Sequence, residues 1–365
     1  MPWSDSYIHK LEKHLGMRFP TMQACFERSE STLNDLTTVV GGKLPAEASF
    51  VAFGSLARKE YTPDSDLDWC LLVDGRADSG HRELERELKA ALKDSGKFKN
   101  PNPTGSFGAL VFGHELVHCI GGSQDTNANL TRRLLLLLES EEVTDGSSGP
   151  LSPRQRLMRG VLERYFEEEA NFPGKPFFPR FFTNDVVRYW RTIAVDYAAK
   201  INERGAVGWA LRNAKLRFSR KLLYIAGLLL TFETSLFPES DLVPRREGPQ
   251  LALFDEKKPQ LSSTEHCFHA LKLTPLELLA RACLRLELPK GAVKAMFSTY
   301  EKFLTILMSE PKRSELANLP FEHAHKSPVF LEVREIGHEF QAAVDKLFLN
   351  RRSKLGALTL KYALF

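Results

Sequence analysis

The sequence lacks the cysteine pattern of a secreted or zinc-binding protein. Its five cysteines are odd in number, and none forms a Cys-x-x-Cys pair, whereas disulfide frameworks and zinc sites need paired or closely spaced cysteines. The N-terminus also lacks the apolar core and cleavage site of a secretory signal. We therefore expect reduced, mostly buried thiols in a cytoplasmic protein.

Long apolar runs and an excess of charge of one sign are absent as well. The longest apolar run, residues 222–232, has 11 residues and includes a glycine, whereas a membrane helix needs about 20 apolar residues. Fifty Lys and Arg residues against 46 Asp and Glu residues give a net charge of only +4. A membrane span is excluded, and the net charge does not by itself indicate a nucleic-acid-binding protein.

The composition, with 43% hydrophobic and 26% charged residues, is that of a globular protein. A chain of 365 residues is long enough for two modest domains. Helical periodicity predicts helices in residues 1–45, two of them within 5–38. Residues 46–145 mix strand and helix patterns, and the breaker residues at 144–150 mark a boundary. Residues 150–365 show helical periodicity only, with a long loop near 238–263. The predicted fold class is α+β, with a small mixed-sheet core and a mainly helical C-terminal region.

Short apolar segments within 46–145 predict the sheet. Residues 49–53 and 68–73 are buried strands, and leucines spaced four apart predict an exposed helix over 81–95. The third strand has two candidates, 109–112 and 115–120, which together would form a hairpin. The next helix begins near Asn127 and includes residues 134–138.

The segment from Gly54 to Asp68 joins the first two strands and carries the chemistry. Gly54 allows the backbone to approach a ligand, Ser55 offers a hydroxyl, and a following helical turn directs free N–H groups to a phosphate. Asp66 and Asp68 are two apart at the start of a strand, so both side chains project from one face and can hold the same cations. Such oxygen ligands suit Mg²⁺, and two Mg²⁺ ions, or Mn²⁺ as an alternative, predict phosphoryl or nucleotidyl transfer.

Gly-Ser, a spacer of about ten residues and Asp-x-Asp resemble the signature of the DNA polymerase beta nucleotidyltransferase superfamily. Within it, Gly54-Ser55 with Arg58, Glu60 and Ser65-Asp66-Leu67-Asp68 is most similar to the N-terminal domain of bacterial protein uridylyltransferases, over roughly residues 48–140. The resemblance implies a role for Arg58 and Ser65 in the nucleotide site. It also implies a third carboxylate on a later strand. Uridylyltransferases carry a hydrolase domain with a His-Asp dyad, and this chain has no His-Asp dipeptide, so we expect no reverse activity.

Glu115 is the first choice for that third carboxylate. It lies on a candidate third strand, six residues before Gly121, as the corresponding acid does in the family that the chain resembles. Asp125 is the alternative, and a solvent-facing role for Glu115 stays open. If neither residue serves, the sequence predicts an inactive enzyme.

Basic residues gather just before the apolar run of the helical region, with no acid among ten positions. Lys215, Arg217 and Arg220 are candidates for binding NTP phosphates or an RNA backbone, and a solvated helix face is the alternative. The neighbours of this group are Arg212 and Lys221. Arg188 and Arg191 present the same choice. Tyr189 and Trp190 favour a packing role over base stacking, and His266, His269, His323 and His325 favour surface or packing roles over metal binding.

The sequence therefore predicts an Mg²⁺-dependent nucleotidyltransferase that moves an NMP from an NTP to an acceptor. A protein side chain is the favoured acceptor, which would give AMPylation or uridylylation, because the motif with Arg58 and Glu60 resembles that of the uridylyltransferases. RNA, suggested by the basic helix, is the main alternative, and a small molecule is a third. A non-catalytic nucleotide sensor or antitoxin-like protein would use the same site without turnover.

Overall fold

The computed structural model describes residues 2–99, 108–144, 151–170, 178–203, 206–238, 242 and 263–363. Most of the predicted loop at 238–263 lies outside the described residues.

The two helices expected within 5–38 are α1 (Tyr7–Leu15) and the longer α2 (Pro20–Val40). Glu277 accepts the backbone N–H of Tyr7 at 2.8 Å, and Glu301 accepts that of Thr21 at 2.6 Å. The carboxylates of Glu277 and Glu301, which lie far away in the sequence, thus cap backbone N–H groups in the first turns of α1 and α2.

A four-stranded mixed sheet forms the core of the first half, in the order β3-β2-β1-β4. Its strands are β1 (Ala48–Phe53), β2 (Trp69–Val73), β3 (Ala109–Phe112) and β4 (Ser140–Val143). β1 pairs antiparallel with both β2 and β4, whereas β2 and β3 are parallel. Parallel neighbours need a crossover, and the predicted helix over 81–95 provides it as α4 (Gly80–Asp94).

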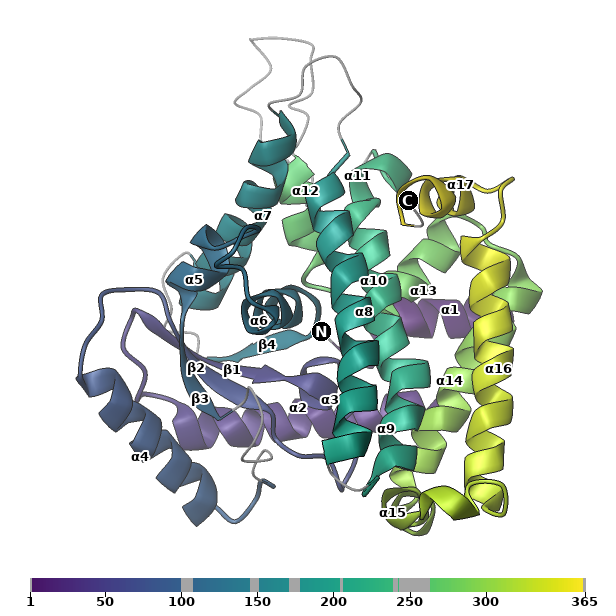
Figure 1. The fold of residues 1–365 in the computed structure, drawn as a ribbon, viewed down its shortest axis with the longest axis horizontal. Helices are drawn as coiled ribbons and strands as arrows, with labels where there is room; N and C mark the ends of the chain where they lie inside the picture. The colour runs from purple at the N-terminus through teal and green to yellow at the C-terminus, as the bar shows by residue number, and fades with distance from the viewer. Residues whose placement is uncertain are drawn as a thin grey trace.

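The two faces of the sheet pack into two different apolar clusters, because alternate residues of a strand point to opposite sides. Phe50, Trp69 and Leu71 face α2 and α4. Val51 and Leu72 face the other way and join the large cluster that continues into the helical half of the chain. On that side lie α6 (Asn127–Leu138) and α7 (Pro153–Ala170). Figure 1 shows α2 and α6 on opposite sides of the sheet.

The hairpin expected at 109–120 is wrong, because only its first half is a strand. Residues 115–120 contribute instead to the short helix α5 (Gly113–His118). The chain leaves the sheet at Gly113, where a Cβ atom would overlap the side chain of Leu157 on α7, so the close packing of these two segments depends on glycine. Sequence reasoning also missed β4, which follows directly on the leucine-rich helix α6.

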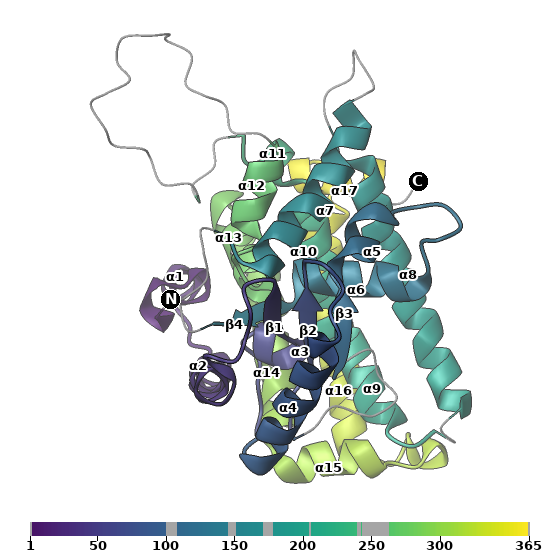
Figure 2. The same ribbon diagram turned by 90° about the vertical axis from the view of Figure 1, so that its left-hand side faces the viewer.

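The remainder of the described chain is helical, as expected. Figures 1 and 2 show these helices gathered beside the sheet rather than around it. None of the helices in the described ranges has the length and apolarity needed to cross a membrane. All five cysteines are free thiols, and only Cys119 among them is not buried. The helices are α8 (Arg180–Glu203), α9 (Trp209–Lys215), the π-helical turn η2 (Leu216–Arg220), α10 (Lys221–Thr231), α11 (Glu233–Leu236), α12 (Ser263–Ala270), α13 (Pro275–Arg285), α14 (Lys290–Met308), α15 (Glu310–Asn318), α16 (Pro328–Phe348) and α17 (Lys354–Tyr362).

Candidate active site

Gly54 ends β1 and begins the single helical turn α3 (Gly54–Ala57). Its φ of +68° favours glycine, and a Cβ atom there would lie 2.8 Å from Oδ2 of Asp68. Glycine is therefore required for two reasons at this position. Its backbone conformation and the close approach of the Asp68 carboxyl group both exclude a side chain.

The loop that carries Asp66 and Asp68 is fixed by hydrogen bonds of its neighbours. Ser65 Oγ accepts the backbone N–H of Thr62 at 3.1 Å, and the hydroxyl of Tyr61 donates to the Ser65 carbonyl at 3.0 Å. The carbonyl of Asp68 accepts the backbone N–H of Phe53 at 2.8 Å, which ties the start of β2 to the end of β1. The two carboxyl groups are thus presented beside Gly54 by a rigid turn.

A cleft of about 560 Å³, part of it open to solvent, lies at this edge of the sheet. The core contributes the carboxyl groups of Asp66 and Asp68, and the helical half contributes the cations Lys215, Arg220 and Arg313. Eight of the residues predicted from sequence line it together: Gly54, Ser55, Arg58, Ser65, Asp66, Asp68, Lys215 and Arg220. Ser219, Glu60, Leu304 and Leu307 complete the lining with Arg313.

The charges of the cleft perturb one another. Burial raises the pKa of Asp68 to about 6, against the opposing effect of Arg220 and with a further rise from Glu139. Burial lowers the pKa of Lys215 to about 8, and the nearby Arg313 and Arg220 lower it further. Within the described part of the chain, no side chain donates a hydrogen bond or forms an ion pair to the carboxyl group of Asp66 or Asp68. Asp68 is half-buried and Asp66 is exposed, and a half-buried charge without a protein partner is typical of a site that binds a charged ligand.

A π-helical turn explains why Lys215 and Arg220 face the cleft together. In an α-helix, residues five apart lie roughly 140° apart around the axis. In η2 the hydrogen bonds join residues five apart, so these residues lie about one turn from each other on the same side. Arg217 is turned away from the cleft and packs beside Gly337 of α16. The basic residues of this segment are therefore divided between two sides of the helix.

Glu139, which sequence reasoning missed, is a fully buried carboxylate shared by two arginines of the cleft. Its Oε1 accepts from Arg220 Nη1 at 2.8 Å, and its Oε2 accepts from Arg58 Nη1. Arg58 also donates to Glu60 at 2.8 Å, and the hydroxyl of Tyr300 donates to the same Glu60 at 2.7 Å. Arg58 is thus buried between two carboxylates, and this network joins the core to α14.

Arg313 of α15 is the second residue that the sequence did not point to. It donates to Thr62 Oγ1 at 2.9 Å and to the carbonyl of Asp64 at 2.5 Å, so it holds the loop just before Asp66. Burial lowers its pKa, while Asp64 and Asp66 oppose that effect. It lies nearly 250 residues beyond the motif, and no local pattern marks it.

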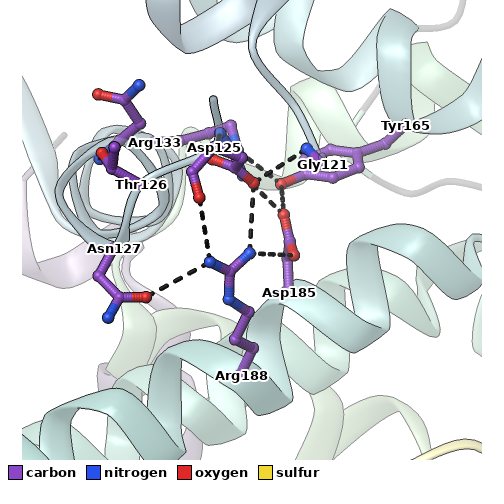
Figure 3. A network of polar contacts seen from close by, with 9 residues as sticks. Gly121, Asp125, Thr126, Asn127, Arg133, Tyr165, Asp185 and Arg188 are labelled. Atoms are coloured by element: carbon purple, nitrogen blue, oxygen red, sulfur yellow. Dashed lines mark hydrogen bonds and ion pairs between the residues drawn. The ribbon is translucent and has the colours of Figure 1, made fainter. Parts of the chain in front are cut away.

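Neither candidate for the third carboxylate lines the cleft. Glu115 is exposed on α5 rather than on a strand, so its expected position on the sheet is wrong. Asp125 is buried in a separate network, shown in Figure 3, where Arg133 and Arg188 donate to its carboxyl group. No group of three or more His, Cys, Asp or Glu side chains in the described residues could hold a metal ion.

Comparison with known proteins agrees with the geometry of the cleft. Residues 35–100 match the family model of the nucleotidyltransferase domain, a range that contains Gly54, Ser55, Asp66 and Asp68. A search among curated proteins finds no match, and the finer likeness to uridylyltransferases stays a prediction. The chain carries a nucleotidyltransferase domain and is a transferase of phosphorus-containing groups.

Proposed function

We propose that the cleft transfers an NMP from an NTP to a protein side chain in an Mg²⁺-dependent reaction. One observation carries the proposal. The carboxyl groups of Asp66 and Asp68 have no hydrogen-bond or ion-pair partner among the described residues, and they line one cleft together with Lys215, Arg220 and Arg313. Such an arrangement leaves the carboxylates available to a cation and Lys215, which has no hydrogen-bond or ion-pair partner among the described residues, available to phosphates.

The residues present fit Mg²⁺. This ion is commonly bound through one or two carboxylates together with substrate phosphates, so a third protein ligand is not required. Asp66 and Asp68 would hold it, and Mn²⁺, with the same preference for oxygen ligands, is the alternative. When bound, the metal supplies neutralisation of the charge on the phosphates.

The chain's own groups position the nucleotide. The start of α3 directs backbone N–H groups toward the cleft beside Ser55, which suits a terminal phosphate. Lys215 and Arg220 bind the phosphates from the opposite wall, with the side chain of Arg220 oriented by Glu139. The acceptor oxygen forms a bond to the α-phosphorus, the bond from that phosphorus to the leaving pyrophosphate breaks, and the proton of the acceptor hydroxyl passes to solvent.

A protein acceptor is supported by the resemblance of the motif with Arg58 and Glu60 to that of the uridylyltransferases. A second function, nucleotide sensing without turnover, is favoured by one observation: the described residues bring only two carboxylates to the metal position. The two functions share the NTP site and differ in whether transfer follows.

The direct test is incubation of the full chain with Mg²⁺, each α-³²P-labelled NTP and a cell lysate. We expect label to enter protein, with loss of this label when Mg²⁺ is removed by EDTA. Asp66→Ala plus Asp68→Ala is the inactive control, and Glu115→Ala is the matched control because it removes an exposed carboxylate outside the cleft.

Each outcome has a distinct meaning. If the label enters RNA or small molecules instead, that class of molecule is the acceptor and the proposed protein acceptor is wrong. Binding of NTP without any transfer would establish the sensor. Transfer that persists unchanged in the Asp66→Ala plus Asp68→Ala variant would refute the mechanism, because both metal-binding carboxylates would then be dispensable.

A further inference from the structure

The basic segment around η2 has a second side that the cleft does not use. Arg217 lies there, with its Nε donating to Asn213 Oδ1 at 2.7 Å. It packs over Gly337, and a Cβ atom on that glycine would lie 3.2 Å from Cδ of Arg217. A side chain at Gly337 would therefore require the flexible side chain of Arg217 to shift by a few tenths of an ångström.

Two further cations lie beside Arg217. Lys221 follows it by one turn, at the start of α10, and Arg334 lies on α16 just before Gly337. Burial is the main cause that lowers the pKa of Arg217, and the nearby charge of Arg334 lowers it further. The pKa of Lys221 is lowered to about 8, mainly by burial and also by the charge of Arg217. Arg217 contacts Gly337 and Lys221 donates to Gln341, so both side chains lie along the stretch of α16 that begins at Arg334. We call Arg217, Lys221 and Arg334 the rear cluster.

The partners of the rear cluster within the described chain are neutral. Arg217 donates to an asparagine, and Lys221 Nζ donates to Gln341 Oε1. The acid that favours the charged form of Lys221 is Asp345, and its Oδ1 already accepts from Gln341 Nε2 at 2.6 Å. None of the three cations forms an ion pair with a described carboxylate. The cluster therefore holds three cations against the single nearby charge of Asp345, which leaves it with an excess of positive charge.

We propose that the rear cluster is a second anion site and binds a phosphate group. Two guanidinium groups and an ammonium group match the several acceptor oxygens and the double charge of a phosphate. The charge of such a ligand would relieve the repulsion among the three cations. The phosphate comes either from a small anion, such as inorganic phosphate or pyrophosphate, or from the backbone of a nucleic acid. The site is separate from the cleft and does not depend on the proposed transfer reaction.

The test must separate this site from the cations of the cleft. Lys215→Met serves as the parent variant because it weakens phosphate binding in the cleft. In this parent we expect titration with inorganic phosphate, followed by isothermal calorimetry, to show one remaining site. Addition of Arg217→Met and Arg334→Met should weaken that binding by at least about tenfold. Lys200→Met, an exposed charge on α8, is the matched control and should leave it unchanged.

A second variant guards against loss of folding. Arg334 is exposed, so Arg334→Met alone should fold normally, which circular dichroism can verify, and should still weaken phosphate binding about threefold. A single-stranded RNA 12-mer distinguishes the two sources. Tighter binding of the RNA than of phosphate, with steep dependence on salt and loss in the same variants, identifies a nucleic acid. Equal affinity of the rear variants and their parent for both probes, or no binding of either probe to the parent, overturns the proposal.

Discussion

Asp68 and Asp125 are two largely buried aspartates of the same half of the molecule, and their surroundings are opposite. Asp125 accepts hydrogen bonds from Arg133 at 3.2 and 3.0 Å and from the backbone N–H of Gly121 at 3.0 Å. Arg188 contacts it as well (Figure 3). Asp68 has the carboxyl group of Asp66 beside it and no donor from the described residues.

The difference shows in the pKa values of the two groups. Burial tends to raise both, but the hydrogen bonds from Arg133 and Gly121 leave the pKa of Asp125 below its usual range. The pKa of Asp68 rises to about 6 because burial is not offset in the same way. A charge that the protein itself satisfies stabilises the fold, whereas a charge left without partners is available to a ligand. From this contrast we propose a structural role for Asp125 and a functional role for Asp68.

The largest expected effect is on catalysis by Asp68→Asn. We expect transfer to fall by at least about 100-fold, because a metal-binding charge worth several kcal/mol in the transition state is lost. The free energy of unfolding at pH 7 should stay the same or rise by about 1 kcal/mol, since a desolvated charge without partners is removed. Transfer assays and urea denaturation measure the two quantities. If Asp68→Asn strongly lowered the free energy of unfolding, Asp68 would have a structural role like that of Asp125, and the proposed difference between the two residues would be wrong.

Asp125→Asn should give the reverse pattern. Its charge is shared between Arg133 and Arg188, and breaking a buried ion pair by removing one partner costs about 3 kcal/mol or more. We expect that loss in the free energy of unfolding, measured by urea denaturation, while the folded fraction keeps its affinity for NTP. Exposed Glu115→Gln is the matched control for stability. If Asp125→Asn instead abolished NTP binding without destabilising the protein, Asp125 would belong to the site.

Local sequence was sufficient for the core of the site and insufficient for its walls. Gly54, Ser55, Asp66 and Asp68 lie within 15 residues between two strands, so the turn between the strands fixes their neighbourhood. Short apolar segments and helical spacing likewise predicted β1, β2 and α4. These features depend on contacts between neighbours in the chain.

The features that were missed depend on distant contacts or on irregular backbone. Glu139 reaches the site from the C-terminal end of α6 and Arg313 from α15, and neither carries a local signal that separates it from other charged residues. Arg217 was expected on the same side as Arg220 because residues three apart share a face of an ideal α-helix. The π-helical turn, which periodicity does not reveal, places it on the other side. Glu115 was misplaced because a short amphipathic segment fits a strand and a helix equally well.

The smallest effect, and the most specific, is the pH dependence of stability through Asp68. Its carboxyl group has a pKa of about 6 in the folded protein and about 3.9 in the unfolded chain. Between these values only the folded protein holds the proton, so the contribution of Asp68 to stability improves as pH falls through 6. In EDTA, the free energy of unfolding of the wild type should therefore rise by about 1 kcal/mol relative to that of Asp68→Asn between pH 7 and pH 5.

The depressed pKa of Asp125 leaves its carboxyl group ionised between pH 7 and pH 5, so its contribution to stability stays constant. Urea denaturation of both proteins at the two pH values measures the difference, and a gap that does not narrow toward pH 5 would mean that Asp68 is not the desolvated charge of the cleft.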